Sequence, residues 1–119
     1  MVVRGGRMDE ETLQAAALYA NEDKKVQRYE LSFFVGQAGE SVEGLVERVG
    51  RIYQQLRRYR TLRQSTTGRL SAAGFELVDC DQHGHCQIVF DDAPSTEQLA
   101  RLASTFDEPE PNPARRSET

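Results

Sequence analysis

The sequence lacks tryptophan, and its 119 residues include only two Cys, two His and four Pro. Two cysteines are too few for the disulfide framework of a small secreted scaffold. No stretch reaches the roughly 18 apolar residues of a transmembrane helix, and the N-terminal residues lack the apolar core of a secretory signal. With 38% hydrophobic and 29% charged residues, the chain is neither collagen-like nor wholly disordered. We expect a cytoplasmic protein that makes no contact with membranes.

Charge is distributed unevenly along the chain. The net charge of −4 and the isoelectric point of about 5.2 disfavour a protein that binds nucleic acid over its whole surface. Residues 41–70 nevertheless hold seven Arg against two Glu, whereas residues 71–119 hold ten acidic groups against three Arg. One strongly basic segment therefore lies within an acidic protein.

The two ends of the chain differ in composition from the middle. Residues 1–8 begin and end with a methionine and include Gly5 and Gly6, which is typical of a flexible leader. Residues 107–119 hold three of the four prolines and no large apolar residue, so they cannot bury enough surface to offset their ordering entropy. We therefore expect one domain over residues 9–106, followed by a disordered acidic, proline-rich tail.

Hydrophobic periodicity predicts the first elements of that domain. Residues 9–21 place Leu13 and Ala17 on one helical stripe. Residues 26–37 alternate as a half-buried strand does, with an apolar face formed by Tyr29, Leu31, Phe33 and Val35. Phe34 interrupts the polar face of this strand, which indicates that another part of the protein covers it.

A helix is predicted to start after Ser41, which is a suitable N-cap residue. Its apolar positions are 42, 45, 46, 49, 52, 53 and 56, and a helix-like spacing continues towards residue 73. The run at 64–68 is poor in helix formers, so both one long helix and two shorter ones remain open. A last helix is predicted after Ser95, which forms a capping-box pattern with Gln98.

Residues 75–92 have the pattern of a β-hairpin, with His83 and Gly84 as the central turn residues. In this register Leu77 faces Phe90, so that the apolar residues share one face. A three-residue loop would place Cys80 opposite Cys86 but would separate the apolar residues, and we prefer the first register.

The predicted element order is α-β-α-β-β-α. Strands with one apolar face each predict an α+β fold with a small three-stranded, mostly antiparallel sheet and helices on one face. Pairing of the first strand with the third would give strand order 1-3-2, half of a ferredoxin-like arrangement. One edge of the strand at residues 26–37 would then be open.

Both cysteines and both histidines of the chain lie within seven residues, as Cys80, His83, His85 and Cys86. Two Cys and two His are a legitimate zinc ligand set, but this tight spacing matches no common zinc site. A disulfide is disfavoured because we expect a reducing compartment, and nearby acidic residues would raise the thiol pKa values. We interpret the segment as a polar turn and predict neither a metal nor another cofactor.

Catalytic patterns are weak. The loop at residues 36–39 lies between a strand and a helix but has neither the full glycine fingerprint nor the lysine of a phosphate-binding loop. Asp91 and Asp92 are adjacent in the predicted strand end and would point to opposite faces. We therefore predict a protein that is not an enzyme.

The arginine-rich segment is the strongest sign of function. Arginine forms forked hydrogen bonds with carboxylates and is enriched at protein interfaces. We expect a small binding or regulatory protein that associates with a protein partner, or with itself as a homodimer, through the open strand edge and the arginine helix. The predicted partner-binding residues are Phe34, Arg51, Arg57, Arg58 and Arg60. A nucleic-acid-binding regulator using the same arginines is the alternative, and a metal-binding protein is a third class.

Overall fold

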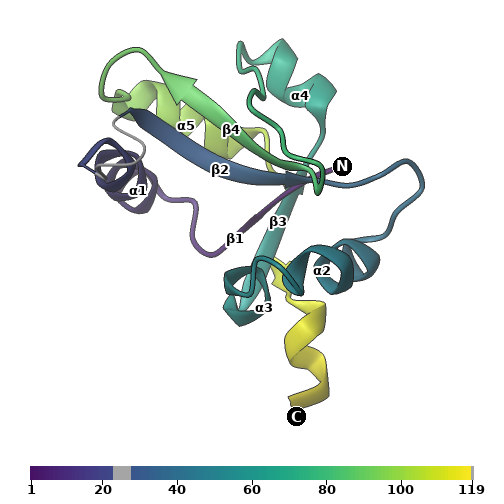
Figure 1. The fold of residues 1–119 in the computed structure, drawn as a ribbon. Coiled ribbons are helices and arrows are strands. Elements are labelled where there is room, and N and C mark those ends of the chain that lie inside the picture. The colour runs from purple at the N-terminus through teal and green to yellow at the C-terminus, as the bar shows by residue number, and fades with distance from the viewer. Residues whose placement is uncertain (23–27, 119) are drawn as a thin grey trace.

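The structure, a computed structural model, describes residues 1–22 and 28–118. Within these residues the order of elements is β1 (Val2–Gly5), α1 (Glu10–Glu22), β2 (Tyr29–Val35), α2 (Val42–Gly50), α3 (Gln55–Arg58), β3 (Thr61–Ser65), α4 (Thr67–Ala72), β4 (His85–Phe90), α5 (Thr96–Ser104), β5 (Glu110–Pro111) and the 3-10 helix η1 (Pro113–Glu118) (Figure 1). The predicted α+β class is confirmed. None of the helices in these two ranges is long and apolar enough to cross a membrane.

The sheet has five strands in the order β4-β2-β1-β3-β5, and every neighbouring pair is antiparallel. The expectation of three strands is therefore wrong. β1 lies in the middle, where Val3 pairs with Phe34 of β2 on one side and with Gln64 of β3 on the other. Val2 and Val3 are completely buried. Residues 2–5 are thus the central strand of the fold and not part of a flexible leader.

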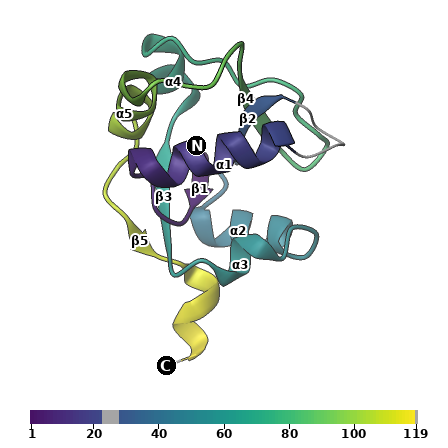
Figure 2. The same cartoon turned by 90° about the vertical axis from the view of Figure 1, so that its left-hand side faces the viewer.

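Helices cover both faces of the sheet, and not one face as expected. Because successive residues of a strand point to opposite faces, Val2 and Val3 belong to two different cores. Val2 packs in the larger core with residues of α1, α4 and α5 such as Leu13 and Leu102. Val3 packs in the smaller core with residues of α2 and α3 such as Leu45 and Leu56. Figure 2 shows α1 and α5 separated from α2 and α3.

β2 confirms the strand predicted from alternation, with Leu31 and Phe33 buried. The predicted start at residues 26–27 lies outside the described residues. The predicted pairing of this strand with the last one is also found, since β2 pairs with β4 along its whole length. The expected open edge is wrong at Phe34 and Val35, because β1 pairs with β2 there through Val3 and Val2.

The segment at residues 41–73 is neither one helix nor two. It forms α2, α3 and α4, and the strand β3 lies between the last two. β3 has only one buried apolar residue, Leu62, and it forms because β1 provides a complete set of backbone partners from Ser65 to Leu62. A strand held mainly by its neighbour leaves little trace in its own hydrophobic pattern.

The predicted hairpin at residues 75–92 is reduced to one isolated bridge between Val78 and Gln87. This bridge is shifted by two residues from the preferred register, in which Val78 faces Val89. The chain turns at Asp81–Gly84, where the Gly84 amide donates to the Asp81 carbonyl at 3.2 Å. Gly84 has a φ of +86°, and a Cβ there would collide with the Val35 carbonyl oxygen. Glycine is therefore required at the closest approach of this turn to β2.

The C-terminal segment is ordered over its described part, in contrast to the predicted tail. Residues 110–111 extend the sheet as β5, and η1 packs against α2 and α3. Asn112 is 1% exposed, and its Nδ2 donates to the carbonyl oxygens of Leu56 and Tyr59, both at 2.8 Å. One buried amide thus fastens this apolar-poor segment to the fold.

Candidate functional site

A groove lined by arginines lies where α2, α3 and η1 meet. Its volume is about 450 Å³, and four of its seven lining residues are arginines: Gly50, Arg51, Gln54, Arg57, Arg58, Ala114 and Arg115. Among the residues whose side chains the structure describes, no acidic one lines it. The structure thus places three of the predicted partner-binding residues together and adds one from the C-terminal segment.

Close packing determines the positions of these arginines. A Cβ added at Gly50 would lie 2.5 Å from Cγ of Arg57, so the aliphatic part of Arg57 runs directly over the end of α2. Arg115 donates from Nη1 to the Arg58 carbonyl oxygen at 3.0 Å. Arg57 and Arg58 remain exposed, although the Arg57 stem packs over Gly50 and the Arg58 carbonyl oxygen accepts from Arg115.

The positive charges of Arg51, Arg57 and Arg58 are only weakly compensated by the described residues. Arg51 forms an ion pair with Glu47 at 3.4 Å, but both side chains are more than 70% exposed. Exposed pairs of this kind contribute about 0–1 kcal/mol. Arg57, Arg58 and Arg60 form no ion pair with any residue in ranges 1–22 and 28–118.

The other two predicted residues lie elsewhere. Arg60 is exposed just before β3 and does not line the groove, although its carbonyl oxygen accepts from the Asn112 amide at 3.0 Å. Phe34 is half-buried on β2, with its ring centroid 5.4 Å from that of Tyr53 and 5.0 Å from that of His85. The predicted cover over Phe34 is therefore Tyr53, from the connection between α2 and α3.

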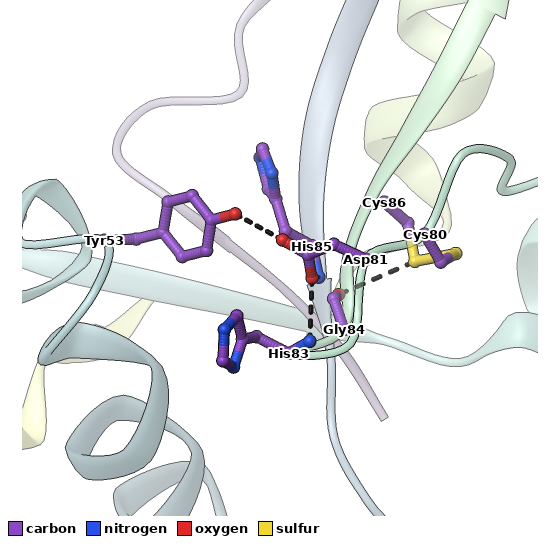
Figure 3. The surroundings of a disulfide bond; sticks show 7 residues. All are labelled: Tyr53, Cys80, Asp81, His83, Gly84, His85 and Cys86. Carbon is purple, nitrogen blue, oxygen red and sulfur yellow. Dashed lines mark hydrogen bonds between the residues drawn. A yellow bond between two sulfur atoms is a disulfide. The ribbon is translucent and has the colours of Figure 1, made fainter.

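The Cys/His segment forms a second cluster, built around a disulfide between Cys80 and Cys86 (Figure 3). The expectation against a disulfide is wrong, since the two cysteines are bonded and their Cα atoms lie 4.1 Å apart. The rings of His83 and His85 point away from the sulfur atoms in Figure 3. Over the described part of the chain, no group of three or more potential ligand side chains is arranged to hold a metal ion.

Asp81 is the centre of this second cluster. One of its oxygens accepts from the backbone amides of His83 and His85 at 2.8 and 2.9 Å, and the other accepts from the Tyr53 hydroxyl. Burial acts to raise the pKa of Asp81, but the hydrogen bonds from Tyr53, His85 and His83 outweigh it and lower the pKa to about 2. The hydrogen bond to Asp81 raises the pKa of Tyr53 to about 12. At neutral pH the pair is therefore a fixed phenol–carboxylate contact, with neither group near the pKa of an acid–base catalyst.

Arg48 provides a further connection between α2 and the disulfide loop. Its guanidinium donates to both carboxylate oxygens of Glu40 at 2.8 Å and to the His83 carbonyl oxygen at 3.0 Å. These forked hydrogen bonds lower the pKa of Glu40. Together with Tyr53, this arginine connects α2 and the segment before α3 to the disulfide loop at Asp81 and His83.

Replacing Asp81 with Asn is expected to lower the free energy of unfolding at neutral pH by about 1–2 kcal/mol, because charge-assisted hydrogen bonds from two amides and a phenol are weakened. The folded-state pKa of Asp81 lies below its usual value of 3.8, so its contribution is present above pH 4 and is lost as the pH falls towards 2. Urea unfolding between pH 2 and pH 7 should therefore show a smaller acid-induced loss of stability for Asp81→Asn than for the native chain. Equal losses would contradict this assignment.

Comparison with protein families, with curated proteins and with solved structures finds no match for this chain. The α+β class and the two side-chain clusters described above are therefore the basis for a proposal of function.

Proposed function

We propose that this protein is a binding protein that takes an acidic polypeptide segment into the arginine groove of α2, α3 and η1. The observation that carries the proposal is a groove of about 450 Å³ whose described lining residues include four arginines and no acidic residue. Arginine forks match carboxylates in geometry and in charge. Arg57 and Arg58 are exposed and form no ion pair within the described residues, so they can make such contacts at little desolvation cost.

The surroundings of the groove favour a short acidic peptide over an extended phosphate backbone. On the far side of Arg51 and Arg57 the surface continues into a smaller depression lined by Glu43 and Glu47. These two glutamates would repel a phosphate chain that runs past the groove, and the whole protein carries a net charge of −4. A segment with a few clustered carboxylates fits within the basic area.

A second copy of this chain is one source of an acidic segment, since residues 71–119 carry ten acidic groups. A different protein is the other source. Both offer the same carboxylate chemistry, and the native mass distinguishes them. A dimer that dissociates when the groove is neutralised identifies the second copy, whereas a monomer that binds an acidic peptide identifies a different partner.

The double variant Arg57→Glu/Arg58→Glu is expected to bind a fluorescent oligoglutamate peptide at least about tenfold more weakly than the native chain. Each lost charge-assisted contact corresponds to about 1.5–3 kcal/mol, and about 1.4 kcal/mol is a factor of ten in affinity. Binding is measured by fluorescence anisotropy over a series of salt concentrations, and native mass is measured by light scattering.

The matched control is Arg7→Glu, which reverses the charge of another exposed arginine far from the groove in the sequence. It should keep the native affinity. Preference for oligothymidylate over oligoglutamate, equal weakening by the control, or a monomer that binds no oligoglutamate would overturn the proposal.

A further inference from the structure

Two arginines lie side by side on the face of the sheet that carries the larger core. Arg4 of β1 and Arg63 of β3 are direct cross-strand partners. On the same face their neighbours Val2 and Ser65 are 0% and 3% exposed. Like charges directly opposite each other destabilise a sheet, so this pairing requires an explanation.

The hydrogen bonds of these arginines are incomplete. Arg4 donates from Nη1 to the Ser32 carbonyl oxygen at 2.7 Å, and its guanidinium lies 5.5 Å from the centre of the Phe33 ring. Its Nε is nevertheless buried without an acceptor, and so is Nε of Arg63. Neither arginine forms an ion pair with a residue of the described ranges.

Burial makes this arrangement unfavourable for the protein alone. It lowers the pKa of Arg4, which indicates that the charged form has lost part of its hydration. A buried donor without an acceptor loses the energy of its bonds to water and gains nothing in return. Two uncompensated charges at neighbouring positions share one remedy, an anion that lies against both guanidinium groups.

We propose that Arg4 and Arg63 form a binding site for a phosphate dianion, either free or as a terminal phosphomonoester. Cross-strand partners have Cβ atoms about 5 Å apart, so two guanidinium groups can reach one tetrahedral anion. Both residues are only half-buried, so the oxygens of the anion accept from the guanidinium N–H groups that remain accessible, and its two negative charges match the two arginines. A carboxylate would supply only one charge.

This site is separate from the arginine groove. Arg4 and Arg63 point to the face of the sheet that carries the larger core, as the burial of Val2 shows, whereas Leu62 and the helices α2 and α3 belong to the smaller core on the other face. Figure 2 shows β1 and β3 next to each other, with α1 passing in front of β1. Substitutions at one site therefore leave the other unchanged.

The test is a titration of the native chain with inorganic phosphate at constant ionic strength, followed by calorimetry and by the melting temperature. We expect saturable binding of one phosphate per chain, with acetate binding at least tenfold more weakly. Arg63→Gln should weaken phosphate binding at least tenfold. The variant Arg58→Gln, in the groove, should keep the native response.

Stability without phosphate provides a second readout, which a purely structural role would not give. Because Arg63→Gln removes an uncompensated charge, its melting temperature without phosphate should equal or exceed that of the native chain, and only the phosphate-dependent rise should be lost. A parallel titration with phosphoserine distinguishes the sources, since tighter binding than inorganic phosphate indicates an esterified ligand and weaker binding a free one. The absence of saturable binding, or an equal phosphate response in Arg63→Gln, would overturn the proposal.

Discussion

A chain that begins at Met8 is expected not to fold. The deletion removes β1, whose two valines are completely buried, one in each core. Burial of a valine contributes about 1.5–3 kcal/mol, and each net backbone hydrogen bond about 0.5–1.5 kcal/mol. Loss of the central strand also leaves β2 and β3 without their shared neighbour. The sum exceeds or equals the roughly 5–15 kcal/mol of total stability that domains have.

Circular dichroism and urea unfolding of the shortened chain provide the measurement. A graded control is Val3→Ala, which should unfold cooperatively with a free energy of unfolding about 1–3 kcal/mol below the native value, since it removes part of one buried side chain. If a chain that begins at Met8 unfolds cooperatively with the same urea midpoint as the full chain, residues 1–7 are dispensable.

The long, regular elements of this fold were predictable from the sequence. α2 begins after Ser41, whose hydroxyl accepts from the Gly44 amide at 3.0 Å. α5 begins with the predicted capping box, in which Ser95 and Gln98 hydrogen-bond reciprocally. The alternation of β2 correctly gave the burial of Phe33. In each case the local pattern and the tertiary environment favour the same structure.

The short strands β1 and β3 were not predictable, because each forms through pairing with the other and not through a pattern in its own residues. β1 is buried on both faces, so its two consecutive valines show no alternation, and two glycines follow them. β3 carries only one buried apolar residue, Leu62. Without β1, residues 61–65 lack a partner, and the remaining spacing fits a helix equally well. Tertiary pairing therefore decided both elements.

The candidate site was predictable in its chemistry but not in its shape. The charge pattern identified Arg51, Arg57 and Arg58, whereas one wall of the groove comes from the segment expected to be disordered. A signal was present there, since Asn112 precedes Pro113, and proline is favoured in the first turn of a helix. Composition outweighed this signal because the segment is held mainly by hydrogen bonds of Asn112 and by the pairing of β5, with little apolar surface beyond Ala114.

Replacing Asn112 with Leu is therefore expected to release η1 and to open the arginine groove. The native side chain donates to the carbonyl oxygens of Leu56 and Tyr59, and its Oδ1 accepts from the Ala114 amide at 3.0 Å. Leucine has a similar size but leaves these buried backbone groups without partners, at about 1–3 kcal/mol each. Because the Tyr59 carbonyl and the Ala114 amide are only part-buried and regain water when η1 is released, we expect the free energy of unfolding to fall by about 2–4 kcal/mol.

The same substitution distinguishes a groove from a loose set of exposed arginines. If Ala114 and Arg115 form a wall that binding requires, Asn112→Leu should weaken oligoglutamate binding at least about tenfold while the circular dichroism of the remaining fold is retained, because Arg51, Arg57 and Arg58 stay on α2 and α3. Glu110→Ala, which alters an exposed residue of the same segment, should change neither stability nor binding appreciably. Native affinity in a folded Asn112→Leu variant would show that the arginines of α2 and α3 act without η1, and native stability would show that the buried amide does not hold the segment. The two measurements separate these cases because the amide acts on the backbone of α3, whereas the proposed partner contacts only the guanidinium groups above it.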